Sequence, residues 1–108
     1  MTEKDQLVSI KLDFSWDPSK AKSNLDKHGV TFVQASSVLL DPLALTVYDL
    51  EHSRFEERWF TLGLSSEGAL LAISHTYEPS SQTNVNVRVI SAREATRRER
   101  LQYENEPQ

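Results

Sequence analysis

Four segments between residues 45 and 90 have the composition and alternation of β-strands, and they limit the fold more than any other feature of the chain. They are Leu45–Tyr48, Arg58–Leu64, Leu70–Thr76 and Val85–Ile90. Residues 65–68 (Ser-Ser-Glu-Gly) suit a hairpin turn, and the polar residues 78–84 are expected to close a second hairpin. Strands joined by hairpins pair in antiparallel fashion. The middle of the chain is therefore predicted to be an antiparallel sheet.

A further strand and a helix are predicted before this sheet. Residues Ser9–Phe14 alternate apolar and polar side chains, as a half-buried strand does. Asp17 followed by Pro18 is a typical helix start, and Gly29 suits a left-handed helix end. Trp16 stands where its ring closes a hydrophobic staple over the first helical turn.

Two more helices follow from similar signals. One is predicted to begin after its cap, Thr31, and to end at Asp41-Pro42. The last is predicted to begin at Ser91, which forms a capping box with Glu94 and leaves Arg93 in the first turn. The resulting order is β-α-α-β-β-β-β-α. It predicts an α+β domain whose mostly antiparallel sheet carries two N-terminal helices and one C-terminal helix.

Length and composition predict one folded domain over residues 1–108, with frayed ends at about 1–8 and 104–108. Hydrophobic residues make up 38% of the chain and charged residues 26%, as in globular proteins. There is no cysteine, and the histidines lack zinc-site spacing, so we expect no metal and no cofactor. No apolar run suits a membrane span or a signal peptide, so we expect a cytoplasmic protein without membrane contact.

Charge is segregated along the chain, although the net charge is only −4. Residues 20–40 and 88–100 are positive on balance, whereas residues 41–78 are strongly negative. This pattern has two interpretations. The positive segments are either ordinary solvated helix faces or a cationic patch for RNA or an acidic partner.

Three stretches resemble motifs of the BrnT family, the toxin component of bacterial type II toxin–antitoxin systems. The first spans residues 14–32 and contains FSWDPSK, an asparagine at position 24 and then KHGVTF. The second is Glu57-Arg58 followed by Leu62-Gly63. The third is RVISAREA at positions 88–95, followed by Glu99-Arg100 and Tyr103. Together they extend over nearly the whole predicted domain.

The resemblance implies a fold similar to the RelE-like ribonuclease toxins and an activity that cleaves RNA and arrests growth. It also implies a BrnA-type antitoxin with a ribbon-helix-helix DNA-binding part. Two toxins and two antitoxins then form a complex that represses its own promoter, so that operator DNA is contacted only through the antitoxin. The chain departs from the family at Glu78, where many relatives have an arginine. An acid at a phosphate-contacting position would weaken the activity.

RNA cleavage without a metal needs a group that transfers protons and cations that stabilise the charge building on phosphorus. The candidate catalytic residues are His28, Glu57, Arg58, His75, Arg88 and Arg93. The candidate RNA-binding residues are Lys20, Lys27 and Arg97. Arg88 and Arg93 flank the expected strand-to-helix junction, where both side chains are in reach of one phosphate.

Each candidate also has a structural interpretation. Arg88 can pair with Glu57 or another acid, His28 can cap helix carbonyls, and His75 can form hydrogen bonds within the sheet. Trp59 suits the core best, although base stacking or a partner contact would also suit it. His52 is expected to lie exposed in a polar turn.

Two functions therefore remain open. One is a ribonuclease toxin, and the other is a catalytically inactive module that binds a partner in transcriptional control. A metal- or nucleotide-dependent enzyme is not supported, because the sequence has no glycine-rich phosphate loop and no metal triad.

Overall fold

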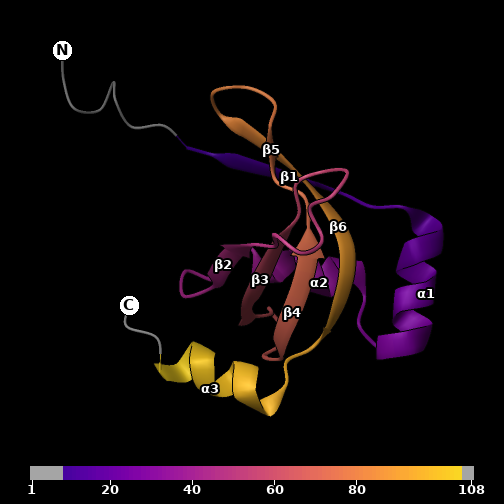
Figure 1. Ribbon diagram of the computed structural model, residues 1–108, viewed down its shortest axis with the longest axis vertical. Helices are drawn as coiled ribbons and strands as arrows, with labels where there is room; N and C mark the ends of the chain where they lie inside the picture. Colours follow the sequence, from indigo (N-terminus) through magenta and orange to yellow (C-terminus); the bar gives the residue numbers. More distant parts are fainter. Residues whose placement is uncertain (1–8, 106–108) are drawn as a thin grey trace.

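A six-stranded, mostly antiparallel sheet forms the centre of the protein in the computed structural model, which describes residues 9–105 (Figure 1). Its strands are β1 (Lys11–Ser15), β2 (Leu45–Tyr48), β3 (Trp59–Leu64), β4 (Leu70–His75), β5 (Glu78–Pro79) and β6 (Asn84–Glu94). They are ordered β1-β6-β4-β3-β2, and β5 pairs with β6. β1 runs parallel to β6, and the other pairs are antiparallel. The predicted α+β class is confirmed.

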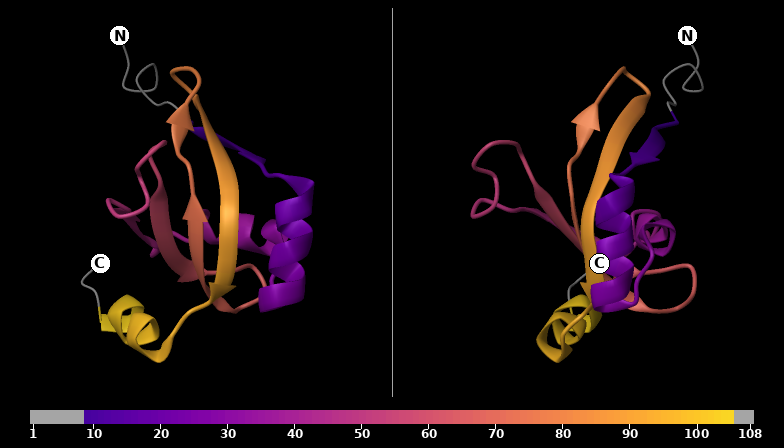
Figure 2. Two further views of the ribbon diagram at one scale, coloured as in Figure 1. Left: turned by 45° about the vertical axis from the view of Figure 1, so that its right-hand side comes forward. Right: turned by 90° about the vertical axis from the view of Figure 1, so that its right-hand side faces the viewer.

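The helices are α1 (Pro18–His28), α2 (Phe32–Val38) and α3 (Arg97–Asn105). Figure 2 shows α1 and α2 on one side of the sheet, α3 at one end, and the β2–β3 loop standing out on the side opposite α1 and α2. The Asp17 carboxylate caps α1 by accepting the Ser19 N–H at 2.8 Å. Gly29 ends this helix at a φ of 69°, and the Thr31 hydroxyl caps α2. These local signals act as predicted.

The main core lies between the sheet and the two N-terminal helices. Its buried residues are Val30, Phe32, Ala35, Val38, Leu71, Ile73, Val89 and Ala92. Trp16 packs against this cluster and meets the Phe32 ring edge to face, with 6.0 Å between the ring centroids. Trp16 thus lies beside the start of α1, as the staple requires. Packing against α1 and α2 therefore covers this face of the sheet.

Helix α1 closes an edge of the sheet through one buried side chain. β1 pairs only with residues 84–88 of β6, which leaves the edge beyond them without a strand partner. The Asn24 amide takes that place: it donates to the Ala92 carbonyl at 2.8 Å and accepts the Ala92 N–H at 3.0 Å. Asn24 also donates to the Val30 carbonyl at 3.1 Å. The asparagine of the first motif therefore joins α1 to β6.

The predicted start of the last helix is wrong. Strand β6 continues through Ser91 to Glu94, and α3 begins at Arg97. The capping box is instead made by Thr96 and Glu99, each side chain accepting the other residue's backbone N–H. Pairing with β4 and the Asn24 hydrogen bonds hold residues 92–94 extended, so sheet formation overrides the local helix signal at Ser91.

This correction moves Arg93 from the helix to the strand. Arg93 no longer shares a face with Arg97 and Arg100, which lie on α3. Residues 104 and 105, which the sequence predicts to fray, belong to α3. The rest of the predicted frayed ends, residues 1–8 and 106–108, lie outside the described residues.

Helix α3 covers one end of the sheet face opposite α1 and α2. Tyr103 packs there against a small apolar cluster of Leu62, Leu70 and Ala72. Its hydroxyl donates to the Asp41 carboxylate at 2.6 Å, which raises the pKa of Tyr103 to about 12. The rest of this face lies beyond α3, and the candidate functional site lies there.

Candidate functional site

A hollow of about 310 Å³ lies on the sheet face opposite α1 and α2. We call it the arginine hollow. Its lining residues are Asp49, His52, Arg58, Phe60, Ser74, Ile90, Ser91 and Arg93. Phe60 pairs with Ser74 and Ser74 with Ser91, so a row of side chains across β3, β4 and β6 forms its floor. It brings together two of the predicted catalytic arginines, Arg58 and Arg93.

A β-bulge in β6 decides which arginines share this face. Ser91 pairs with Ser74 and Val89 pairs with His75, so Ile90 is the extra residue between them. Side chains of a regular strand alternate between faces, and residues five apart would point to opposite sides. The extra residue reverses the alternation. Arg88 and Arg93 therefore lie on the same face of the sheet.

Arg93 is held by a carboxylate from α3. Its two terminal nitrogens donate to the two oxygens of Glu99 at 2.8 and 3.0 Å. This hydrogen bonding from Arg93 lowers the pKa of Glu99 to about 2 and raises the pKa of Arg93. The pair fixes the guanidinium at the edge of the hollow, where 40% of the Arg93 side chain is exposed. A phosphate would have to share or displace the carboxylate.

Arg58 approaches the hollow from the end of the β2–β3 loop. Its backbone N–H donates to the Ser53 hydroxyl at 2.9 Å, which anchors the main chain just before β3. Its side chain is half-buried and lies 3.5 Å from the Glu56 carboxylate. Its Nε is buried and has no hydrogen-bond partner within residues 9–105. Arg58 is thus less fully neutralised than Arg93.

His52 and Asp49 line the same hollow as a hydrogen-bonded pair. His52 Nδ1 donates to the Asp49 carboxylate at 2.9 Å, and the His52 backbone N–H donates to it at 3.2 Å. The predicted exposure of His52 is confirmed, since 60% of its side chain is exposed. Its position beside two arginines was missed. The available signal was an aspartate three residues before a histidine in one turn between two strands.

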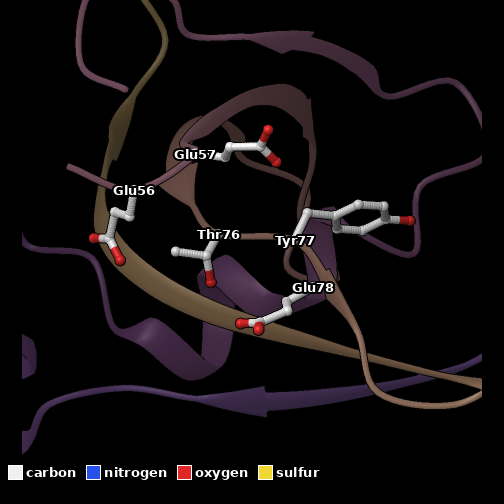
Figure 3. Close-up of a pocket in the computed structure, with 5 residues that line it drawn as sticks. All are labelled: Glu56, Glu57, Thr76, Tyr77 and Glu78. Atoms are coloured by element: carbon white, nitrogen blue, oxygen red, sulfur yellow. The ribbon is translucent and has the colours of Figure 1, made fainter. Parts of the chain in front are cut away.

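Arg88 and Glu57 do not line the arginine hollow, and Glu57 lines a separate acidic hollow of about 280 Å³. Figure 3 shows its lining residues, Glu56, Glu57, Thr76, Tyr77 and Glu78, with three carboxylates around one opening. Arg88 donates to the Glu56 carboxylate, and this hydrogen bond lowers the pKa of Glu56. The predicted structural pairing of Arg88 thus occurs, with Glu56 rather than Glu57. The surplus carboxylates would repel a phosphate.

The N-terminal basic residues form a third hollow, which adjoins the first. This lysine hollow, of about 270 Å³, is lined by Lys20, Ser23, Asn24, Lys27, His28, Ile90 and Ser91. Ile90 and Ser91 also line the arginine hollow. The bulge thus forms the ridge between two cationic depressions on neighbouring surfaces. Arg97, the remaining RNA-binding candidate, is exposed on α3 and lines none of these hollows.

His75 is buried in the sheet and does not reach the surface. Its Nδ1 donates to the Thr76 carbonyl at 2.9 Å, so its Nε2 accepts the Thr61 hydroxyl at 2.7 Å in the neutral ring. Thr61 in turn lies 2.8 Å from the Thr46 hydroxyl. Burial lowers the pKa of His75, although the Thr76 hydrogen bond opposes the shift. His75 therefore does not line the arginine hollow.

The buried His75 predicts a loss of stability in mild acid. Below its ordinary pKa of 6.5 the unfolded chain binds a proton that the folded chain excludes, so the free energy of unfolding falls as pH falls. Glu99 contributes to the pH dependence only at lower pH. Its pKa is lowered to about 2, so its stabilising effect begins to be lost only when the pH falls below its ordinary pKa of 4.5. Urea unfolding at about pH 7 and pH 5 should show the decrease. His75→Gln should remove most of this decrease in the free energy of unfolding. If the free energy of unfolding of His75→Gln falls between about pH 7 and pH 5 as much as that of the wild type, His75 is not the cause.

Within residues 9–105, no group of three or more histidine, aspartate or glutamate side chains is arranged to hold a metal ion. The same residues include no helix that is long and apolar enough to cross a membrane.

Comparisons with known proteins point to one family. A family model described as "Ribonuclease toxin, BrnT, of type II toxin-antitoxin system" matches residues 16–99. The crystal structure of the Brucella abortus ribonuclease toxin BrnT superimposes with a TM-score of 0.54 at 22% sequence identity. The match covers 84% of this chain and 100% of that one, and it establishes a shared fold. A comparison with curated proteins found no match.

Proposed function

Since this chain belongs to the BrnT family of ribonuclease toxins from type II toxin–antitoxin systems, we propose that it is a metal-independent endoribonuclease whose substrate lies in the arginine hollow. The observation that carries the proposal is that Arg58 and Arg93 line one hollow. A guanidinium donates two hydrogen bonds to a phosphate and stabilises the charge that builds as the phosphorus is attacked. Arg58 and Arg93 are therefore the phosphate-contacting residues.

The RNA backbone continues from the arginine hollow over the Ile90–Ser91 ridge into the lysine hollow. The two hollows share these residues, and the second contributes Lys20, Lys27 and His28. These cations bind neighbouring phosphates and give the affinity a strong dependence on salt. The acidic hollow lies off this path because Glu57 and Glu78 repel the backbone. Glu78 then removes a possible phosphate contact and weakens the activity without abolishing it.

The partner is a BrnA-type antitoxin with a ribbon-helix-helix DNA-binding part. Family membership supports an antitoxin partner. Two toxins and two antitoxins form the complex, which represses its own promoter and contacts operator DNA through the antitoxin alone. The active toxin acts in the cytoplasm, where its RNA substrate is found.

A second candidate function is a partner-binding module without catalysis. The observation in its favour is that Arg88 and Arg93 each face a carboxylate, Glu56 and Glu99. If these pairs persist in the presence of RNA, neither arginine is available to a phosphate. Such a protein would bind its antitoxin and support repression while leaving RNA intact.

One experiment separates the two functions. The full chain, purified under denaturing conditions and refolded without partner, is incubated with cellular RNA in the presence of EDTA. The proposed enzyme cleaves the RNA, and an equimolar BrnA-type antitoxin stops the cleavage. Intact RNA at high protein concentration and normal growth of cells that express the chain would overturn the enzyme. Partner binding and repression without RNA cleavage would establish the binding module instead.

A further inference from the structure

We infer that Asp49 and His52 are the proton-transfer pair of this site, with His52 as the general base and Asp49 as its positioning residue. The inference rests on the ribonuclease function proposed above and assigns the one role that the two arginines cannot perform. A guanidinium stays protonated and cannot accept the proton of a 2′-hydroxyl. Imidazole is the side chain best suited to that task near neutral pH.

The geometry of the pair gives the ring a defined tautomer. A carboxylate only accepts hydrogen bonds, so the short contact between His52 Nδ1 and Asp49 puts the proton on Nδ1. The lone pair of the neutral ring is then on Nε2, which makes no hydrogen bond within residues 9–105. Because 60% of the His52 side chain is exposed but only 19% of Asp49, the base meets solvent while its partner is held by the protein.

The loop that carries the pair is closed by its own hydrogen bonds. The Asp49 N–H donates to the Arg58 carbonyl at 2.9 Å, which extends the β2–β3 pairing into the loop. The Ser53 hydroxyl donates to the Asp49 carbonyl, and the Arg58 N–H donates to Ser53 Oγ. Asp49, Ser53 and Arg58 are thereby linked. The proton-transfer pair and a phosphate-contacting arginine are therefore positioned by the same few bonds.

The other histidines are less suitable as the base. His75 is fully buried, with both ring nitrogens occupied by Thr61 and Thr76. His28 lies in the lysine hollow, which Arg58 and Arg93 do not line. Of the three histidines, His52 is the one that lines the arginine hollow.

The reaction step follows from this arrangement. His52 Nε2 takes the proton of a ribose 2′-hydroxyl, the 2′ oxygen bonds to the adjacent phosphorus, and the bond from phosphorus to the 5′ oxygen breaks. The leaving 5′ oxygen takes a proton from water, and the resulting hydroxide removes the proton from the imidazolium. The products are a 2′,3′-cyclic phosphate and a 5′-hydroxyl end. Arg58 and Arg93 stabilise the charge on the phosphoryl oxygens.

The test compares His52→Ala with Glu51→Ala, an exposed neighbour in the same loop that does not line the hollow. Loss of a general base typically costs about 10²- to 10⁴-fold in rate. We expect His52→Ala to lose that much in kcat, whereas Glu51→Ala cleaves like the wild type. Added imidazole should partly restore cleavage by His52→Ala. Asp49→Asn should lower kcat by a smaller factor and leave KM unchanged.

Binding is measured separately with a 2′-O-methyl RNA oligonucleotide, which cannot be cleaved by this route. His52→Ala should bind it as the wild type does. If the wild type cleaves RNA and His52→Ala cleaves equally fast, the assignment of the base is overturned while the ribonuclease function stands. If the wild type leaves RNA intact, the proposed function itself fails. Loss of binding by a folded His52→Ala would make His52 a contact residue and also overturn the assignment.

Discussion

Arg93→Met is expected to lower RNA cleavage by about 10²- to 10³-fold, the usual effect of removing one preorganised donor from a developing oxyanion. Arg93 lines the arginine hollow and is held in place by both oxygens of Glu99. Methionine keeps an unbranched side chain of similar length but removes every donor. Initial cleavage rates of a fluorescent RNA oligonucleotide measure the effect, and circular dichroism verifies that the variant is folded.

The matched control is Glu99→Gln, which removes the ion pair by changing the carboxylate partner of Arg93. Glutamine retains an oxygen that can accept the Thr96 N–H, so the capping box of α3 survives. It also removes the negative charge that competes with a phosphate for Arg93. We expect Glu99→Gln to cleave at least as fast as the wild type and to bind RNA more tightly. Equal losses of activity in Arg93→Met and Glu99→Gln would instead show that Arg93 acts only through its pair with Glu99.

Asn24→Ala is expected to destabilise the domain by roughly 3 kcal/mol or more, because it leaves three buried hydrogen-bonding groups without a partner at about 1–3 kcal/mol each. These are the N–H and carbonyl of Ala92 and the carbonyl of Val30. Small domains have a total stability of only about 5–15 kcal/mol, so the loss is large. The free energy of unfolding from urea titration measures it.

Ser23→Ala is the control for Asn24→Ala, since Ser23 is the exposed neighbour on the same helix. Its effect should stay within about 0.5 kcal/mol. Asn24→Asp should also destabilise the domain, because a carboxylate would face the carbonyl oxygens of Ala92 and Val30. Equal stability of the Asn24→Ala and Ser23→Ala proteins would mean that α1 is held to β6 by apolar packing alone.

The helix starts and stops near the N-terminus followed directly from the sequence. Asp17, Gly29 and Thr31 act through hydrogen bonds to residues a few positions away. Such bonds form whatever the rest of the chain does, so the pattern suffices to predict them. The motif series likewise predicted the family, which the match over residues 16–99 confirmed.

The start of the last helix could not be predicted from the local sequence pattern alone. Ser91 with Glu94 and Thr96 with Glu99 have the same spacing, and each suits a capping box. The choice between them depends on β4 and on Asn24, which bind residues 92–94 as a strand. Those partners lie far away in the sequence. A local signal cannot say whether distant groups will compete for the same backbone.

The sequence alone determined the α+β class, the starts of the first two helices, the end of the first helix and the family, because these depend on short-range hydrogen bonds, alternation and ordered motifs. The second helix ends at Val38, before the predicted end at Asp41-Pro42. Only the tertiary structure decided which charged groups meet. An extra residue at Ile90 reverses the alternation of β6, and the β2–β3 loop brings His52 beside Arg58 and Arg93. Strand register and loop closure are properties of the whole sheet, so no single segment encodes them.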